Sequence, residues 1–421
     1  MHFWYKFFTY LFYSIAPIYL YIRKIRKKEH PKRYLEKLSR IKINRDNGYL
    51  VWFHVASIGE AMSVLPIVED CIKNSKIDKI LITSITFSSG KVLEKKFDKN
   101  LKVFHQFLPL DINILTNKFL NHWKPNLCIF IDSEIWPNLI LGISKRKIPL
   151  LLFNARITKK SYLRWKLVIN FAKKIFEKFD LCIASNKESE EFLKVLGAKN
   201  IRNYGNLKFV KTKNEINKQL DSLLLNKIKE RKIWCAASTH QDEEKMCAKS
   251  HLNIKKIHSG VLTIIIPRHI DRVNEINKEL SNLDLKVVLY SDFEQVNSDT
   301  DVLLVDNYGE AIKFYNISKY VFLGKSLVEK LKTNSGQNPI EPARLGCKVF
   351  HGPNVSNFRE IYDYLNSLGI TKKINNYEEL SKKLVEEFQE NKAKNHEIAS
   401  KLEDYGQNIF DKVTNELQKY I

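Results

Sequence analysis

Short apolar runs alternate with amphipathic stretches along most of this chain, and that alternation limits the possible folds more than any other feature. The first half contains GYLVWFHVAS, KILITSIT, KVFHQFLP, LCIFID, IPLLLFNA and FDLCIAS. Each run has the length of a strand, and the segments between the runs are long enough for crossover helices. The pattern predicts a mostly parallel sheet with helices on both of its faces.

The alternation stops near residue 210 and then starts again. VKTKNEINKQLDSLLLNKIKER is polar and has no strand signal, whereas KIWCAAS, VLTIIIP, LKVVLYS, DVLLVD, KYVFLG and CKVFHG follow it. A chain of 421 residues is also too long for one ordinary core. We therefore expect two Rossmann-like, doubly wound α/β domains facing a cleft. The expected ranges are a membrane anchor with its basic flank at 1–28, a first domain at 29–210, a linker at 211–231, and a second domain with C-terminal helices at 232–421.

The N-terminal segment FWYKFFTYLFYSIAPIYLYI, residues 3–22, is apolar and rich in aromatic residues. It has about the length that crosses a bilayer, and Trp and Tyr favour the membrane interface. No small-residue cleavage site follows, which favours a retained anchor over a signal peptide. Lys6 and Pro17 weaken the case for a span, so the segment either spans the membrane or lies in its interface. A buried helix of a soluble fold is the alternative.

Five basic residues follow this segment directly. The positive-inside rule keeps such a flank cytoplasmic, and clustered Lys and Arg attract anionic lipid. We therefore expect the main body of the chain, which follows this flank, on the cytoplasmic face of a membrane. The flank consists of Arg23, Lys24, Arg26, Lys27 and Lys28.

The formal net charge of +23 predicts attraction to polyanions, namely nucleic acid, acidic lipid or a phosphorylated substrate. A solvated coat of lysines explains the same number. The sequence shows no nucleic-acid-binding motif and no basic stripe interleaved with aromatic residues, so we expect no nucleic-acid partner. The six cysteines form no CxxC pair. We therefore expect neither a disulfide framework nor a zinc site, and the pattern favours a reducing compartment.

Ligands of doubly wound sheets bind beyond the carboxyl ends of the strands, and the segment ASIGEA follows the first strand. Ser57 or Gly59 opens a helix there, and Glu60 lies in its first turn. One interpretation is a general base, kept ionised by the helix N-terminus. The other is an acidic residue placed there for the helix dipole alone.

Two later strands of the first half also end in polar residues. Glu134 in IDSEIWPN contacts a substrate hydroxyl or caps a helix, and both interpretations stay open. Asn154 and Arg156 end the strand in FNARIT. Arginine there suits a carboxylate or a phosphate, which it binds through two parallel hydrogen bonds.

In the second half, Ser238 and Thr239 stand between a strand and a helix in AASTHQDEE, as an ordinary N-cap or as part of an anion site. Arg268 in IIIPRH suits a phosphate, and Glu310 ends the strand in DVLLVDNYGE. The loop of residues 324–326 in FLGKSLV contains small residues, and its exposed amides suit phosphate oxygens. Its spacing matches no P-loop.

The segment SGQNPIEPARLG, residues 335–346, reads as a capped helix. Asn338 is the expected N-cap, Pro339 the N1 residue, Glu341 the N3 residue and Gly346 the C′ residue. Capping leaves the residues before Asn338 unexplained. Together with the loop at 324–326, the segment predicts a sugar-nucleotide site with phosphate on the amides and ribose hydroxyls on Glu341.

An ordered set of these segments resembles a known family. The set comprises WFHVASIGE, SEIWPN, NARIT, GNLKF, AASTH, PRH, GE, GKSLV, NPIEPARLG and GP, and it extends from Trp52 to about Phe358. It is similar to that of the 3-deoxy-D-manno-octulosonic acid (Kdo) transferases of lipopolysaccharide biosynthesis, which are membrane-associated glycosyltransferases of the GT-B fold.

The resemblance implies inverting transfer of Kdo from CMP-Kdo to a lipid A precursor (lipid IVA), with no bound metal and no cofactor. It implies that Glu60 is the catalytic base. The residues implied in CMP binding are Arg268, Ser326, Leu327, Asn338 and Glu341, with Ser238, Thr239 and Glu310 as weaker members. The residues expected on the acceptor side are Ser57, Gly59, Glu134, Asn154 and Arg156.

The chain departs from the family at two places. The family usually has glycine where this chain has Lys325, and histidine where it has Gln337. Two other functions stay open. One is a GT-B glycosyltransferase that uses a different nucleotide sugar on a lipid acceptor, and the other is a non-catalytic basic protein that binds membranes or nucleic acid.

Overall fold

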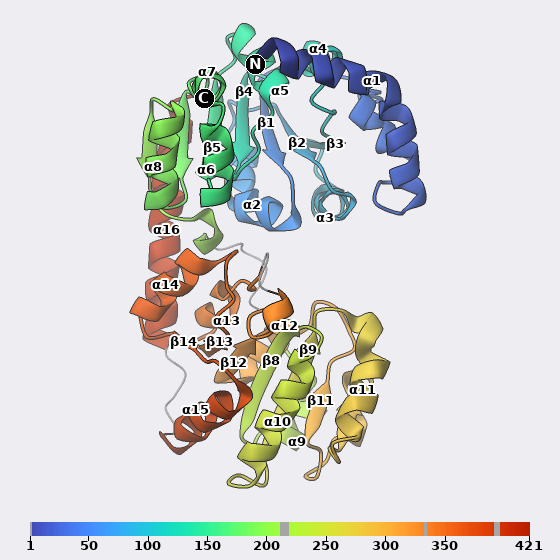
Figure 1. Cartoon of the computed structure of the whole chain (residues 1–421), viewed down its shortest axis with the longest axis vertical. Helices are drawn as coiled ribbons and strands as arrows, with labels where there is room; N and C mark the ends of the chain where they lie inside the picture. Colours follow the sequence, from blue (N-terminus) through green and yellow to red (C-terminus); the bar gives the residue numbers. More distant parts are fainter. Residues whose placement is uncertain (1, 211–218, 332–334, 391–395) are drawn as a thin grey trace. The chain divides into compact units, whose positions relative to one another are not determined.

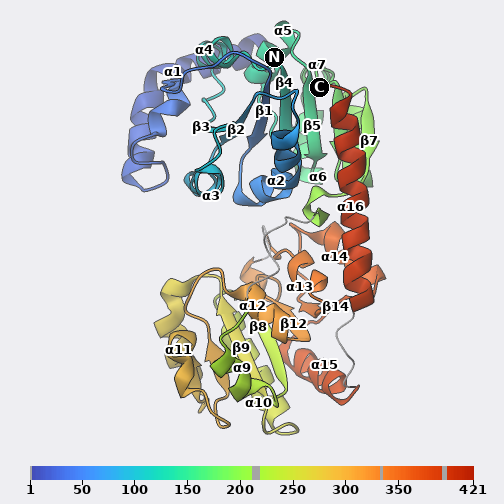
Figure 2. The same cartoon turned by 180° about the vertical axis from the view of Figure 1, so that it is seen from behind.

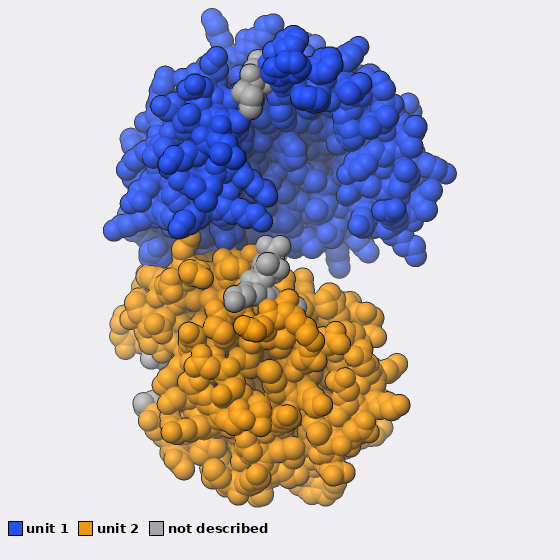
Figure 3. Space-filling model, viewed as in Figure 1, with its two compact units in different colours: residues 1–212, 405–421 blue, residues 213–404 orange. Residues whose placement is uncertain are grey.

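The computed structural model describes residues 2–210, 219–331, 335–390 and 396–421. The chain divides into two compact units, coloured separately in Figure 3. Unit 1 comprises Met1–Thr212 and Tyr405–Ile421, and unit 2 comprises Lys213–Asp404. Each unit contains one parallel sheet, so the predicted fold class of two doubly wound α/β domains is confirmed.

In the described part of unit 1 the sheet has seven parallel strands in the order β3-β2-β1-β4-β5-β6-β7. The order reverses at β1, whose neighbours are β2 and β4. Such a reversal is the topological switch point at which doubly wound sheets bind ligands. The strands are β1 (Leu50–Val55), β2 (Lys79–Ser84), β3 (Val103–Phe107), β4 (Leu127–Ile131), β5 (Leu150–Ala155), β6 (Leu181–Ala184) and β7 (Ile201–Asn203).

The central strands of unit 1 are apolar throughout because both faces of the sheet are covered. Every residue of β1, β4 and β5 is buried. On one face, Trp52 packs against Phe119 and Phe130 with ring centroids 4.9 and 5.3 Å apart. Figure 1 shows the helices of this unit around the sheet. They are α1 (His2–Ile25), α2 (Ile58–Lys73), α3 (Phe87–Phe97), α4 (Asn113–Trp123), α5 (Pro137–Lys145), α6 (Lys159–Lys166), α7 (Ile169–Phe176) and α8 (Lys187–Leu196), with 3₁₀ turns at Tyr34–Leu38 and Leu207–Phe209.

Unit 2 repeats this plan. Its described residues form a seven-stranded parallel sheet in the order β10-β11-β9-β8-β12-β13-β14. The switch point lies at β8, between β9 and β12, which is the position that β1 has in unit 1. The strands are β8 (Ile233–Thr239), β9 (Leu262–Pro267), β10 (Val287–Leu289), β11 (Val302–Leu304), β12 (Tyr320–Leu323), β13 (Lys348–His351) and β14 (Thr371–Lys373).

The core of unit 2 also lies on both faces of its sheet. Trp234 and Phe322 belong to one cluster, and Cys235 and Val321, their neighbours along the strands, belong to the other. The helices are α9 (Ser222–Ile228), α10 (Glu243–Lys255), α11 (Val273–Ser281), α12 (Ala311–Ile317), α13 (Ile340–Arg344), α14 (Arg359–Ser367) and α15 (Tyr377–Glu390), with 3₁₀ turns at Ile270–Arg272, Tyr290–Gln295 and Glu329–Leu331.

The structure divides the chain at other places than the sequence analysis expected. Part of the expected linker, residues 211–218, lies outside the described residues. The rest of it contains α9, whose Leu224 and Ile228 are buried in the core of unit 2 together with Leu220. A segment with three core side chains, two of them on α9, belongs to the domain that it packs on.

The C-terminal helix α16 (His396–Gln418) is the second difference, because residues from Tyr405 onward belong to unit 1 and not to the second domain. Figure 2 shows its last turns beside β7. The Tyr204 hydroxyl donates to Glu416 Oε1 at 2.8 Å. Gly406 lies so close to the Phe209 carbonyl that a Cβ atom would not fit. The polar tail of the sequence gives no sign of this return.

The expected N-terminal helix is present as α1, and it packs on unit 1 beside α4 (Figure 1). Ala16 and Leu20 are buried against Ile112 and Leu115. The Tyr5 hydroxyl donates to the Asp111 carboxylate at 2.7 Å. Among the residues that the structure describes, no helix combines the length and apolar character needed to cross a bilayer.

Candidate active site

The first candidate residue, Glu60, lies at the switch point of unit 1. Helix α2 begins directly after β1 with Ser57 as its N-cap, which was one of the two expected helix starts. Ser57 Oγ accepts from the Glu60 N–H at 3.3 Å and donates to Glu60 Oε1 at 2.9 Å. The Ala56 N–H donates to Glu60 Oε2 at 2.7 Å. This arrangement resembles a capping box, except that the carboxylate accepts from the N–H of Ala56, the residue before the N-cap. It fixes the Glu60 carboxylate at the carboxyl end of β1.

The electrostatic setting of Glu60 differs from the one expected. Burial raises its pKa to about 7, and the nearby charges of Asp132 and Glu134 act in the same direction. The hydrogen bonds from Ala56 and Ser57 oppose that shift without cancelling it. The expectation that the helix N-terminus keeps Glu60 ionised is therefore wrong, because desolvation outweighs the dipole. A carboxylate with a pKa near 7 suits a general base at neutral pH.

Glu134 follows β4, the neighbour of β1. Its Oε2 atom lies 3.2 Å from His54 Nε2 and accepts from Trp136 Nε1 at 2.9 Å. Helix α5 begins only at Pro137, so Glu134 contacts side chains and is not the helix cap that was one of its two interpretations. Glu60, Asp132 and Glu134 thus form a cluster of acidic residues at the ends of two adjacent strands.

His54 is a residue of this site that the sequence analysis missed. It is fully buried on β1, with Nδ1 2.9 Å from Thr83 Oγ1 and Nε2 toward Glu134. Thr83 Oγ1 also accepts from Trp52 Nε1 at 2.9 Å. The available signal was a histidine inside an otherwise apolar strand, one residue before the strand ends at Val55.

Of the other residues expected on the acceptor side, Arg156 lies at the carboxylate cluster, whereas Asn154 positions a loop and Gly59 is exposed. Asn154 is buried with a left-handed φ of 54°, and its Oδ1 accepts from the Leu207 N–H at 2.9 Å, so it positions a loop. The Arg156 N–H donates to the Asp132 carbonyl at 3.3 Å, which brings that residue to the carboxylate cluster. Gly59 is exposed, and a Cβ there would meet only Ser57 Oγ, at 4.0 Å.

The switch point of unit 2 carries a buried carboxylate as well, Glu243, the first residue of α10. Its Oε2 accepts from the backbone N–H of His240 at 3.0 Å and of Lys325 at 2.6 Å. Its Oε1 accepts from the N–H of Ser326 at 2.9 Å and of Leu327 at 3.0 Å. Burial raises the pKa of Glu243, and these hydrogen bonds oppose the shift.

This arrangement corrects the expectation for the loop after β12. The amides of residues 324–326 were expected to be exposed for phosphate oxygens. In the structure the Gly324 N–H donates to the Ala237 carbonyl, and the N–H groups of Lys325 and Ser326 donate to Glu243, as does that of Leu327. A side-chain carboxylate and a phosphate oxygen satisfy the same turn geometry. Lys325 has a left-handed φ of 56°, a conformation that glycine adopts without strain, at a position where the family usually has glycine.

The expected N-cap before α10 is also wrong. Ser238 and Thr239 belong to β8, and the N-cap of α10 is Asp242. Thr239 is buried beside the Glu244 carboxyl. The strand extends two residues further than expected because Thr239 pairs with Pro267 after a register shift.

Positive charges gather around the ends of β8, β9 and β12. Burial, together with the nearby Lys325 and Arg268, lowers the pKa of His240 to about 4, and the hydrogen bond to the Ser238 carbonyl opposes this shift. The His240 and His269 rings lie 5.5 Å apart. Arg268 is exposed, and its N–H donates to the Thr239 carbonyl at 2.9 Å. This cluster suits an anion.

The segment at 335–346 forms a helix, but its cap is shifted. Pro339 is the N-cap of α13, and Asn338 Oδ1 accepts from the Ile340 N–H at 3.2 Å. Glu341 lies exposed in the first turn. Gly346 has a φ of 75° directly after the C-cap, so its predicted C′ position is confirmed.

Glu310 has a local partner. It is the N-cap residue of α12 and forms an ion pair of 2.6 Å with Lys313. This contact keeps its carboxylate on the first turn of the helix. Its expected part in CMP binding stays a prediction.

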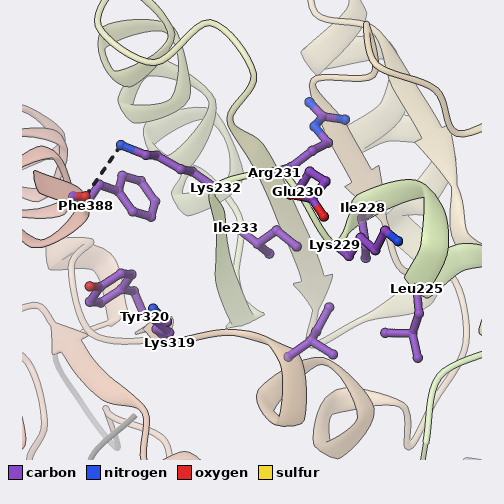
Figure 4. A pocket seen from close by; sticks show the side chains of 11 residues that line it. Leu225, Ile228, Lys229, Glu230, Arg231, Lys232, Ile233, Lys319, Tyr320 and Phe388 are labelled. Carbon is purple, nitrogen blue, oxygen red and sulfur yellow. Dashed lines mark hydrogen bonds between the residues drawn. The ribbon is translucent and has the colours of Figure 1, made fainter. Parts of the chain in front are cut away.

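A cavity of about 470 Å³ lies at the amino ends of β8 and β12 in unit 2 (Figure 4). Its lining includes Lys229, Lys232, Lys319, Tyr320 and Phe388. Lys232 Nζ approaches the Phe388 carbonyl at 3.5 Å. The lining contains none of the predicted site residues, so this cavity is separate from the candidate site. Among the described residues, no group of three or more His, Cys, Asp or Glu side chains could hold a metal ion.

Comparison with solved structures supports the fold. A putative UDP-N-acetylglucosamine 2-epimerase from Listeria monocytogenes matches with a TM-score of 0.59 and 13% identity, covering 89% of this chain and 98% of that one. MurG of Acinetobacter baumannii matches with a TM-score of 0.51 and 9% identity, covering 89% and 100%. At such identities the likeness shows the fold alone, which is that of GT-B-like two-domain proteins.

Comparison with protein sequences is more specific. The family model described as 3-Deoxy-D-manno-octulosonic-acid transferase (kdotransferase) matches residues 32–211. A 3-deoxy-D-manno-octulosonic acid transferase of Rickettsia bellii is 32% identical over 407 residues, covering 91% of this chain and 96% of the relative. One of the same name from Haemophilus influenzae is 31% identical over 318 residues, covering 75% and 73%. The chain therefore belongs to the family of 3-deoxy-D-manno-octulosonic acid transferases and is a glycosyltransferase.

Proposed function

We propose that this transferase moves Kdo from CMP-Kdo to a lipid A precursor, lipid IVA, in lipopolysaccharide core biosynthesis, with inversion and without a metal. The observation that carries the proposal is the carboxyl of Glu60, which the Ala56 N–H and the Ser57 hydroxyl hold at the switch point of unit 1 with a pKa of about 7. Such a group exchanges protons at neutral pH, as the reaction requires.

In the proposed reaction, ionised Glu60 takes the proton of an acceptor hydroxyl. The hydroxyl oxygen forms a bond to the anomeric carbon of Kdo, the bond from that carbon to the phosphate oxygen breaks, and CMP leaves with the electron pair. One displacement inverts the anomeric centre. Asp132 and Glu134 support this role because their negative charges raise the pKa of Glu60 and make it a stronger base.

The donor is proposed to bind unit 2 at its switch point. Arg268 and Lys325 provide positive charge near the ends of β9 and β12, where it stabilises the phosphate of the leaving CMP. Asn338 and Glu341, at the start of α13, are the proposed contacts to the nucleoside. Carboxylates suit ribose hydroxyls because both oxygens accept hydrogen bonds.

We propose that α1 holds the protein at the inner membrane by lying in the interface, with the catalytic body on the cytoplasmic face. One side of α1 is packed on unit 1, while Phe3, Trp4, Phe8 and Leu11 are among its exposed side chains. An exposed aromatic face followed by a basic flank fits anionic lipid. Arg23 of that flank is paired with Glu29 at 2.6 Å, so the other basic residues supply most of the attraction.

The membrane proposal is tested by sedimentation with vesicles of phosphatidylglycerol. The triple variant with Trp4→Ser, Phe8→Ser and Leu11→Ser should bind at least about tenfold more weakly, because it removes apolar burial without touching the core of unit 1. Leu223→Ser, an exposed leucine of unit 2, is the control. Equal binding by the triple variant contradicts the role of α1.

The catalytic proposal is tested with purified protein, CMP-Kdo generated in place, and a tetra-acylated lipid A precursor. Mass analysis should show the acceptor gaining Kdo, and the same mixture with UDP-sugars should give no product. Transfer from a UDP-sugar in place of CMP-Kdo would support the alternative of a different donor. No transfer from either donor contradicts the proposed function.

A further inference from the structure

Glu243 connects two loops at the switch point of unit 2. It is fully buried at the start of α10, and each of its two oxygens accepts two backbone hydrogen bonds among the described residues. Three of those bonds come from the loop of residues 325–327, more than 80 positions away in the sequence. Hydrogen bonds to an ionised acceptor are roughly twice as strong as neutral ones.

The same loop then holds two further segments through its opposite side. The Lys325 carbonyl accepts from the Gly336 N–H at 2.7 Å. The Ser326 carbonyl accepts from the Asn354 N–H at 2.9 Å, and Ser326 Oγ accepts from the Gly352 N–H at 2.9 Å. The loop therefore lies between Glu243 and the segments that begin at Gly336 and Gly352.

Close packing leaves the loop little freedom to shift. A Cβ atom on Gly324 would lie 2.7 Å from Glu243 Oε2 and 2.6 Å from the Ser238 carbonyl oxygen. Ser326 is fully buried, and its hydroxyl also donates to the Leu323 carbonyl at 2.5 Å. The loop conformation thus depends on the position of the Glu243 carboxylate.

We propose that Glu243 is a positioning residue of the donor site, acting through the loop of residues 325–327 on the segment that carries Asn338 and Glu341. This inference rests on the proposed function, because it assumes that CMP binds there. It also assigns the phosphate to cationic side chains such as Arg268 and Lys325, since the loop amides already donate to Glu243.

The test uses Glu243→Gln with Glu244→Gln as its matched control. Glu244 is the next residue on α10 and is also fully buried, but its carboxylate pairs with Arg272 at 3.2 Å. In Glu243→Gln an amide NH₂ replaces one oxygen and faces N–H groups that need an acceptor. We expect CMP affinity to fall at least about tenfold, the KM for CMP-Kdo to rise, and the KM for the acceptor to stay unchanged. Hydrogen exchange at 325–327 should accelerate in this variant and not in the control.

Two results separate the failure of this inference from that of the function. If the unsubstituted protein does not bind CMP, the proposed function is contradicted, and the inference falls with it. If the protein binds CMP and Glu243→Gln binds it equally well, only the positioning role is overturned. Should Glu243→Gln fail to fold, Glu243→Asp, which keeps the charge but shortens the reach, is measured in the same way and judged by the same two results.

Discussion

The two units place a carboxylate at the same point of the same topology and surround it differently. Glu60 follows β1 beside β4, and Glu243 follows β8 beside β12. Across its switch point Glu60 meets the acidic residues Asp132 and Glu134. Across the equivalent point Glu243 meets the N–H groups of residues 325–327.

This difference shows how neighbours decide what a buried carboxylate does. Burial raises the pKa of both residues. Glu60 is half-buried and lies beside like charges, which raise its pKa toward neutrality and let it exchange a proton there. The oxygens of Glu243 are engaged by backbone donors, so its carboxylate is suited to holding a loop. We therefore expect substitutions at the two positions to affect different steps of the reaction.

The largest effect is expected from Glu60→Gln. Loss of a general base lowers turnover by about 10²–10⁴-fold, and CMP affinity should stay unchanged because unit 2 is untouched. Steady-state kinetics with CMP-Kdo and calorimetry with CMP measure the two quantities. Glu243→Gln should instead lower CMP affinity more than turnover. Weaker CMP binding by Glu60→Gln would contradict the assignment of the two residues to different steps.

Two glycine substitutions compare how tightly the two switch points are packed. Gly324→Ala forces a Cβ against Glu243 Oε2, and such overpacking costs about 1–3 kcal/mol of stability and should weaken CMP binding. Gly59→Ala, at the helix start that carries Glu60, meets only Ser57 Oγ at 4.0 Å and should stay within about 0.5 kcal/mol. Chemical denaturation measures both, and equal stability losses would mean that the two helix starts are packed alike.

A smaller effect is expected from Asp132→Asn. Removing a negative charge that raises the pKa of Glu60 should shift the acid limb of the pH–rate profile to lower pH, by up to about one unit. Asp292→Asn, on an exposed turn of unit 2, is the control. An unshifted limb in Asp132→Asn would mean that burial alone sets the pKa of Glu60.

The smallest effect is on stability. The folded-state pKa of Glu60 is raised from 4.5 to about 7, so its contribution is present below pH 4.5 and is lost as the pH rises toward 7. Glu60→Gln should therefore show a shallower fall in unfolding free energy across that window. Denaturant melts at several pH values test this, and parallel pH dependence in both proteins would argue against the raised pKa.

Much of the fold follows from local patterns. The apolar runs predicted the central strands of both sheets. Ser57 was one of the two expected helix starts in ASIGEA, and it is the observed N-cap because its contacts with Glu60 are local. Gly346 was predictable for the same reason. The edge strands β7 (IRN) and β14 (TKK) are mostly polar, so no apolar run in the sequence marks them.

Features that depend on distant contacts could not be predicted. Glu243 reads as an ordinary first-turn acid until the fold brings residues 325–327 to it. The return of α16 to unit 1 depends on Tyr204 and Gly406, which are some 200 residues apart. The raised pKa of Glu60 depends on Asp132 at the end of another strand.

The most direct test of the account is the pH dependence of kcat/KM for Kdo transfer, measured from about pH 5 to 9. If Glu60 is the base, the rate of the unsubstituted protein rises through a pKa near 7, and the residual rate of Glu60→Gln lacks that limb. If Glu60→Gln keeps the same limb at a comparable rate, another group takes the proton and the assignment of Glu60 is wrong.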